Sequence, residues 1–85
     1  MRADIERLGY FGSYARGDWG VGSDLDLIAI VTDSDQPFAE RALAWDLDDL
    51  PVPAELLVYT SAEWSRMIAS GARFARVIEA EAAWL

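Results

Sequence analysis

Residues 27–31, Leu-Ile-Ala-Ile-Val, are apolar without interruption, and this short run constrains the fold more than any other stretch of the chain. A strand without a polar face is typical of the centre of a sheet that is covered on both sides. Two acids, Asp24 and Asp26, alternate with Leu25 and Leu27 at the start of the same strand. The sequence therefore predicts a buried central strand that carries carboxylates at its entrance.

The two carboxylates are expected to project from one face of that strand. Alternate side chains of a strand share a face, so Asp24 and Asp26 would lie roughly 7 Å apart at their backbones. Like charges in one site disfavour joint ionisation unless a cation lies between them. A hard divalent ion with oxygen ligands is the simplest such cation, with Mg²⁺ the first candidate and Mn²⁺ the second.

The composition restricts the chemistry available to such a site. The chain has 85 residues, with no cysteine and no histidine. The commonest general base, the commonest metal ligand and any thiolate nucleophile are therefore absent. Acid–base or metal chemistry must use carboxylates, which favours a functional role for Asp24 and Asp26.

The net charge of −8, with arginine as the only basic residue type, bears on the choice of partner. Nucleic-acid binding draws most of its affinity from cationic contacts to phosphates, so direct binding of DNA or RNA is not expected. A small nucleotide neutralised by Mg²⁺, or a protein with a basic face, suits an acidic chain better. Since no apolar run approaches the roughly eighteen residues of a membrane span and no signal peptide is evident, we expect a cytoplasmic protein.

The rest of the chain alternates between strand-like and helical patterns. We expect strands near residues 5–11 and 54–60, and a short helix after the Gly12–Ser13 turn. Residues 82–85 suit either a last short strand or a frayed helix end. The result is an α/β (α+β) fold, one domain over residues 1–85 with a small, mixed, twisted sheet and helices mainly on one face.

A helix is predicted to begin at Pro37, because proline suits the first turn of a helix. Asp35 or Gln36 would provide its cap, and its apolar pattern continues to about Asp49. The positions expected on its apolar side are Phe38, Ala42, Leu43, Trp45, Leu47 and Leu50.

Two more helices are predicted after the strand at residues 54–60. Thr60 or Ser61, followed by Glu63, forms a capping box, and Gly71 ends the helix that this box begins. A last helix follows, whose inward residues are expected to be Phe74, Val77 and Ile78.

Two motifs resemble those of a known family. They are Phe11-Gly12-Ser13-Tyr14-Ala15-Arg16-Gly17 and Gly22-Ser23-Asp24-Leu25-Asp26-Leu27. Together, at this spacing and each beside a strand-like run, they resemble the minimal nucleotidyltransferases of the DNA polymerase β-like superfamily. The alternative is an Asp- and Gly-rich turn with solvated acids. The resemblance implies the minimal catalytic fold of that superfamily, with two Mg²⁺ ions between the carboxylates and a nucleoside triphosphate.

The Gly12–Ser13 turn is the predicted phosphate-binding element. Gly12 allows a phosphate to approach the main chain, Ser13 offers a hydroxyl, and the resemblance implies that this pair binds the triphosphate. Arg16 is placed to clamp a phosphate, since a guanidinium offers forked donors. Its alternative is a structural ion pair with Asp18.

The loop that follows contributes three further candidates. Ser23 belongs to the second motif and is included among the nucleotide-binding residues on that basis. Tyr14 and Trp19 could stack on a base, or could simply cover the local core.

Glu55 is the candidate third carboxylate. The superfamily carries an acid on a neighbouring strand, flanked by hydrophobic residues, and Glu55 between Ala54 and Leu56 fits that position. Adjacent strands lie about 4.8 Å apart, so its side chain could reach Asp24 and Asp26. The alternative is an edge-strand acid that points to water.

The resemblance implies two functional classes. The first is an Mg²⁺-dependent enzyme that transfers AMP from ATP to an acceptor hydroxyl, with Asp24 and Asp26 holding both ions and Glu55 the one that activates the acceptor. That acceptor could be a tyrosine of a helical HEPN-type toxin, for which the protein would act as antitoxin. The second is a binding module that neutralises such a partner by complex formation alone, favoured by the small size and by the lack of room for the helix that usually precedes the first strand.

Overall fold

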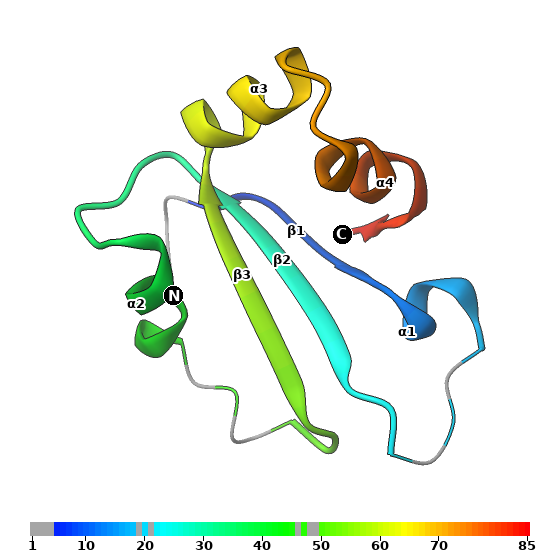
Figure 1. Ribbon diagram of the computed structural model, residues 1–85. Coiled ribbons are helices and arrows are strands. Elements are labelled where there is room, and N and C mark those ends of the chain that lie inside the picture. The colour runs from blue at the N-terminus through cyan, green and yellow to red at the C-terminus, as the bar shows by residue number, and fades with distance from the viewer. Residues whose placement is uncertain (1–4, 19, 21, 46, 48–49) are drawn as a thin grey trace.

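The computed structural model describes residues 5–18, 20, 22–45, 47 and 50–85. Its sheet has the strand order β3-β2-β1-β4 (Figure 1). The elements in chain order are β1 (Ile5–Phe11), α1 (Ser13–Arg16), β2 (Leu25–Val31), α2 (Phe38–Arg41), the 3-10 helix η1 (Ala42–Ala44), β3 (Ala54–Thr60), α3 (Ser61–Ala69), α4 (Arg73–Glu81) and β4 (Ala83–Trp84). In the described residues no helix is long and apolar enough to cross a membrane.

Strand β2 is the centre of this sheet, as its apolar run predicts. It pairs with β1 in antiparallel and with β3 in parallel orientation, and β4 adds to the far side of β1. The sheet is therefore mixed, and the predicted α+β class is confirmed. Of the two alternatives for residues 82–85, the structure forms the short strand.

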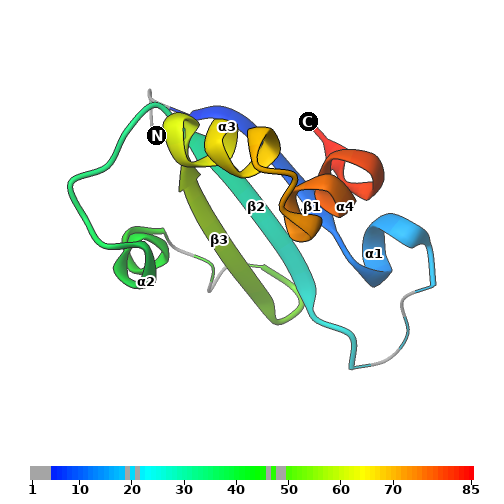
Figure 2. The same cartoon turned by 45° about the horizontal axis from the view of Figure 1, so that its top comes forward.

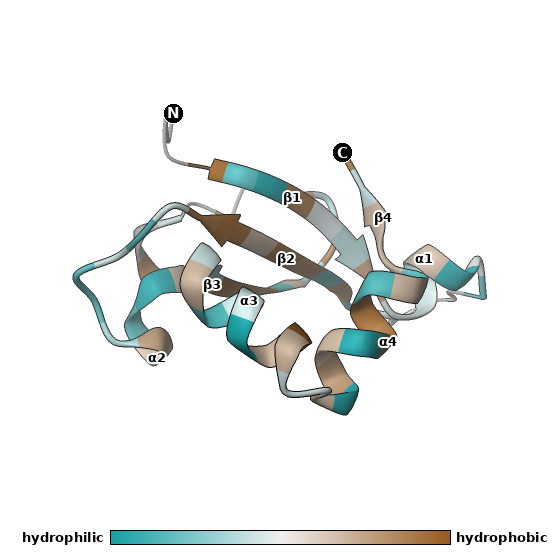
Figure 3. Ribbon diagram, turned by 90° about the horizontal axis from the view of Figure 1, so that it is seen from above, coloured by the Kyte–Doolittle hydropathy of each residue, from teal (hydrophilic) through white to brown (hydrophobic). Residues whose placement is uncertain are grey.

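Both faces of β2 are buried, and different elements cover them. Ile28 and Ile30 pack against α3 and α4, while Ala29 and Val31 lie on the opposite face. Figure 2 shows α3 and α4 above the sheet, and Figure 3 shows β2 as an apolar band between the layers. The opposite face is covered by η1 and the segment after it, so helices cover it only in part.

The helix predicted from Pro37 to about Asp49 is shorter than expected. It becomes a 3-10 helix at Ala42 and ends at Ala44, and Trp45 is already extended, at φ −104° and ψ 137°. Asp49 lies outside the described residues. The extended backbone allows Trp45 and Leu47 to reach the face of the sheet that carries Ala29 and Val31.

The prediction for this helix was wrong on its apolar side and at its cap. Three residues expected on the apolar side are exposed: Leu43 at 81%, Phe38 at 42% and Leu50 at 36%. The change to 3-10 geometry rotates Leu43 away from the sheet. The cap is Pro37, with no side-chain hydrogen bond from Asp35 or Gln36. The main-chain carbonyl of Gln36 instead accepts a hydrogen bond from Arg41 Nε at 2.9 Å.

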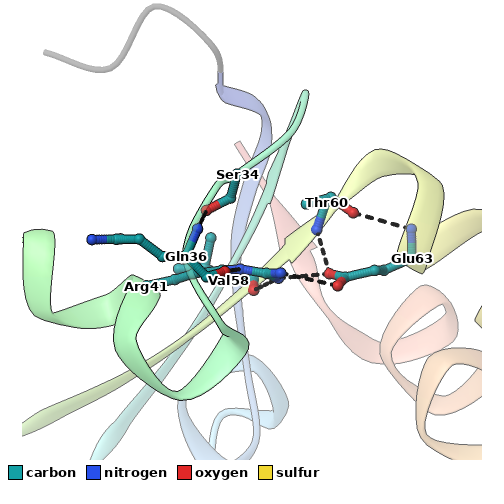
Figure 4. A network of polar contacts seen from close by, with 6 residues as sticks. All are labelled: Ser34, Gln36, Arg41, Val58, Thr60 and Glu63. Carbon is teal, nitrogen blue, oxygen red and sulfur yellow. Dashed lines mark hydrogen bonds and ion pairs between the residues drawn. The ribbon is translucent and has the colours of Figure 1, made fainter.

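Arg41 is a buried cation that the sequence pattern does not reveal, since it is only 8% exposed. Its guanidinium donates to both carboxylate oxygens of Glu63, at 2.6 and 3.0 Å, and to the carbonyl of Val58 at 3.1 Å (Figure 4). Val58 belongs to β3, which is an edge strand of the sheet. Arg41 therefore joins α2 to α3 and satisfies a carbonyl at that edge.

Glu63 has a second role in the same network, as the predicted capping box. Thr60 accepts a hydrogen bond from the Glu63 N–H, and the Glu63 carboxylate accepts one from the Thr60 N–H at 2.9 Å. The Arg41 guanidinium, opposed in part by burial, and the Thr60 N–H lower the pKa of Glu63 from 4.5 to about 2. At neutral pH this carboxylate is fully ionised, and it joins Arg41 of α2 to the beginning of α3.

Helix α4 is held by another carboxylate. Glu79 accepts hydrogen bonds from Arg7 of β1 at 2.7 Å and from the indole N–H of Trp64 at 2.8 Å. The buried side of α4 is Ala75 and Ile78. Phe74 and Val77, which were predicted to point inward, are instead 37% and 39% exposed.

Two glycines allow the C-terminal part to fold over the sheet. Gly71 adopts φ +74° directly after α3, and its predicted role in ending that helix is confirmed. A Cβ at Gly9 would lie 2.8 Å from the Ala83 carbonyl oxygen and 2.9 Å from the Trp84 ring, so β4 can pair with β1 only because this residue has no side chain.

The low pKa of Glu63 predicts that the stability of the protein depends on acid. The stabilisation that ionised Glu63 provides is complete above pH 4.5, which is its pKa in the unfolded chain, and it is lost as the pH falls from there toward about 2. Glu63→Gln should therefore unfold more easily by roughly 1–3 kcal/mol at pH 7, and this difference from the parent should shrink as the pH falls below 4.5. Urea titrations at several pH values measure it.

The matched control is Glu6→Gln, which changes an exposed acid of β1. It should leave stability nearly unchanged at every pH. A Glu63→Gln effect that stayed constant from pH 7 to pH 3 would contradict a role for the ionised carboxylate.

Candidate active site

The sheet brings Asp26 and Glu55 together on one face. Asp26 lies opposite Phe11 across the β1–β2 pair and opposite Glu55 across the β2–β3 pair. Directly opposed residues of neighbouring strands point to the same face, with Cβ atoms about 5 Å apart. The three residues therefore form one line across the sheet, here called the Phe11–Asp26–Glu55 row.

This row lies on the side of the sheet that α3 and α4 cover. Asp26 shares its face of β2 with Ile28 and Ile30, which pack against those helices. The row lies at the end where β2 and β3 begin and β1 ends, so the side chains are less covered there. Asp26 is half-buried and Glu55 is exposed.

Asp24 lies one residue before β2 and is exposed. The start of the strand beside it is fixed, since the Leu25 N–H donates to the Pro53 carbonyl at 2.8 Å. Within the described part of the chain, no three or more acidic side chains converge as a ready-made metal cage. Asp24 lies outside the paired part of β2, so the shared face of Asp24 and Asp26 stays a prediction.

The donor set nevertheless fits a hard divalent ion. Mg²⁺ is usually held by one or two carboxylates together with substrate phosphates, and rarely by a cage made of protein alone. Asp26 and Glu55 supply two carboxylates from adjacent strands. Such a set suits an ion that is completed by a triphosphate.

Gly12 lies directly against the Asp26 carboxylate. A Cβ at this position would overlap Asp26 Oδ2, and the backbone, at φ +74° and ψ −149°, occupies a region almost reserved for glycine. The predicted need for glycine here is therefore real, although the neighbour that the structure shows is a carboxylate. The main chain of the turn and the carboxylate of Asp26 border the same space.

Ser13 begins α1, a single helical turn. Its carbonyl accepts hydrogen bonds from the N–H groups of Gly17 and Asp18, so the turn is closed by its own backbone. Gly17 closes it in a left-handed conformation, at φ +80°. Ser13 itself is half-buried beside Gly12 and thus borders the entrance of the site.

Arg16 pairs with Asp18 in this structure, through Nε and Oδ2 at 3.3 Å. Both side chains are more than half exposed, and such surface pairs contribute little to stability. The structural alternative is thus the observed arrangement. The pair is weak enough for Arg16 to exchange Asp18 for a phosphate.

Ser23 shapes the loop before β2. Its hydroxyl oxygen accepts the Gly20 N–H, and its own N–H donates to the Gly20 carbonyl, both at 3.0 Å. This small closed turn directly precedes Asp24. Of the two aromatic candidates near this loop, Trp19 lies outside the described residues, and Tyr14 is half-buried in α1 and engaged within the protein.

The sequence analysis did not predict the aromatic cluster of Phe11, Tyr59 and Phe74 beside the row. The Phe74 ring of α4 contacts Phe11 edge-to-face, with ring centroids 6.1 Å apart, and lies 6.3 Å from the ring of Tyr59. The signal that could have revealed it is the spacing of Ala75, Ile78 and Ala82, which already defines a buried stripe for α4 without Phe74.

The mixed sheet thus places the Gly-Ser turn against one carboxylate and a second carboxylate on the next strand. A family model described as "Nucleotidyltransferase domain" matches residues 2–83, and the chain therefore belongs to this family. It is thus a nucleotidyltransferase-domain protein, as its two motifs indicate. No curated protein and no solved structure matches the chain.

The contact between Gly12 and Asp26 can be tested with Gly12→Ala. The added methyl group must displace the carboxylate and strain the backbone, so stability should fall by about 1–3 kcal/mol and nucleotide binding should weaken. Thermal unfolding and titration with Mg²⁺–ATP measure the two effects.

Gly20→Ala is the control, because a Cβ there meets nothing within 4 Å. It should preserve both properties. Unchanged stability and binding in Gly12→Ala would show that neither the conformation nor the close approach matters.

Proposed function

We propose that the protein is a divalent-metal-dependent nucleotidyltransferase that moves AMP from ATP to an acceptor hydroxyl. The observation that carries this proposal is the Phe11–Asp26–Glu55 row with Gly12 against its central carboxylate. Membership of the nucleotidyltransferase family supports the reaction class. ATP as donor and a hydroxyl as acceptor rest on the resemblance of the two motifs to minimal nucleotidyltransferases.

In this proposal Asp24 and Asp26 hold Mg²⁺, and Glu55 shares the ion that faces the acceptor. When bound, the ions neutralise the triphosphate and stabilise both the attacking and the leaving oxygen. The backbone of the Gly12–Ser13 turn, the Ser13 and Ser23 hydroxyls and the Arg16 guanidinium orient the phosphates. The two hydroxyls and the guanidinium are hydrogen-bond donors, and Gly12 is the position where the main chain can approach a phosphate closely.

The reaction is an in-line displacement at the α-phosphorus. The acceptor oxygen forms a bond to that phosphorus while the bond to the oxygen bridging the α- and β-phosphates breaks. The electron pair of the broken bond leaves with pyrophosphate. The hydroxyl proton passes to solvent beside Glu55, which is the exposed carboxylate of the row.

A tyrosine hydroxyl of a helical, HEPN-type partner is the acceptor that the family resemblance suggests. The alternative is a module that neutralises this partner by binding alone. The pair of neighbouring carboxylates favours the enzyme. Asp26 and Glu55 lie side by side on adjacent strands, and the repulsion between two such acids is a cost that a protein with only a binding surface does not need.

The metal requirement is the first test. ATP should bind measurably with Mg²⁺ or Mn²⁺ and not in EDTA, because the bare triphosphate would meet carboxylates in a protein of net charge −8. Calorimetric titration in the two buffers measures this. Equal affinity in EDTA would exclude the metal-bridged arrangement.

The three carboxylates should differ in their effects. Asp24→Asn and Asp26→Asn remove metal ligands and should weaken Mg²⁺–ATP binding on the order of 10–100-fold, the range for groups that support a metal site. Glu55→Gln should keep Mg²⁺–ATP affinity while AMP transfer falls about 10²–10⁴-fold, the range for losing a positioned activator. Transfer is followed with ATP labelled at the α-phosphate and a protein acceptor co-purified from the same cells.

Asp33→Asn is the matched control, because this exposed acid follows β2 at its other end. It should behave as the parent in both assays. If Glu55→Gln transferred AMP at the parental rate, Glu55 would be a surface acid with no part in the reaction.

A further inference from the structure

We propose that Phe74, resting on Phe11, is the platform against which the nucleobase of the donor nucleotide stacks. This inference rests on the proposed function and assigns the base-binding part of the same site. The π-face of an aromatic side chain suits any base, so the expected ligand class is a nucleoside triphosphate with modest preference among bases.

The position of Phe74 follows from two contacts. Phe11 is the direct neighbour of Asp26 in the row, and Phe74 lies edge-to-face on Phe11. Its ring also approaches Tyr59 of β3, so it lies over the sheet between β1 and β3, where β2 runs. Figures 2 and 3 show α4 on the same side of the sheet as α3. A nucleotide whose phosphates are at Asp26 and Gly12 would have its nucleoside beside this ring.

The packing of α4 leaves Phe74 available for a ligand. Ala75 and Ile78 form the buried side of this helix, and Glu79 anchors it by binding Arg7 and Trp64. Phe74 lies outside this buried pair, and it remains 37% exposed. A single exposed apolar residue is ordinary; what distinguishes this one is its place at the border of the carboxylate row.

The first turn of α4, which carries Phe74, contains no acid that would repel a triphosphate. Arg73 and Arg76 of the same helix line a separate surface pocket with Val77, Ala80 and Glu81. Of the stacking candidates chosen from the sequence, Tyr14 is engaged within the protein, and Trp19 is outside the described residues.

The experiment separates the base from the phosphates. Calorimetry compares Mg²⁺–ATP with Mg²⁺–triphosphate, the inorganic ion that lacks the nucleoside. Phe74→Leu should weaken ATP binding by at least about fivefold, the lower end for one stacked base, and leave triphosphate binding unchanged. Phe74→Trp, which restores a larger π-face, should recover the ATP affinity.

Phe38→Leu is the matched control. Phe38 is 42% exposed and also contacts Tyr59, with ring centroids 4.9 Å apart, but it approaches from α2 and is not adjacent to the row. The same substitution there should leave both affinities unchanged. Equal losses in Phe38→Leu and Phe74→Leu would attribute the effect to the packing of Tyr59 and overturn the proposal.

Failure of this inference is distinguishable from failure of the proposed function. If the parent binds ATP and triphosphate equally well, or if Phe74→Leu changes neither, the base does not stack on Phe74 although the phosphate site stands. If the parent binds neither ligand with metal present, the proposed function fails and this inference fails with it.

Discussion

The pairing of β2 with two neighbours of opposite orientation is the constraint on which the rest of the structure depends. The antiparallel pairing with β1 aligns Asp26 with Phe11, and the parallel pairing with β3 aligns it with Glu55. A shift of one residue in either register would turn a carboxylate to the opposite face. The packing of β2 on both faces opposes such a shift, because it would exchange Ile28 and Ile30 with the smaller Ala29 and Val31 between the two cores. The core of the protein therefore fixes the geometry of its site.

Charged hydrogen bonds hold the helices against the sheet and so add to the stability that the small core provides. Glu63 binds Arg41 and caps α3, and Glu79 binds Arg7 and Trp64 beneath α4. Both carboxylates have a lowered pKa, Glu63 chiefly because of Arg41 and Glu79 chiefly because of Arg7. Asp26 and Glu55 differ from these two acids, because no arginine partner of either is found in the described residues. In the proposed function, a cation that arrives with the nucleotide neutralises them.

The helices α3 and α4 connect stability with the proposed chemistry. Their buried side covers the face of the sheet that carries Asp26, and their orientation is set by Glu63 and Glu79. Phe74 reaches the border of the row only because α4 is rotated to bury Ala75 and Ile78. The same rotation leaves the Phe74 ring partly exposed, which is what the proposed stacking on a nucleobase requires.

The sequence by itself determined the local features. The uninterrupted apolar run at residues 27–31 predicted the central strand, Thr60 and Glu63 predicted the capping box, and the Gly-Ser and Asp-x-Asp motifs predicted the family. Each is a pattern among near neighbours, so propensity and spacing suffice to recognise it.

Only the tertiary structure decided the rest, because it depends on contacts between distant residues. The early end of the helix after Pro37 follows from Trp45 and Leu47 reaching the sheet, which outweighs helical periodicity. The burial of Arg41 depends on Glu63, which lies 22 residues away in the sequence. The exposure of Phe74 depends on the rotation of α4 that buries Ala75 and Ile78. Local sequence does not encode these partners, since hydrogen bonds and packing across the fold choose among faces that periodicity leaves equivalent.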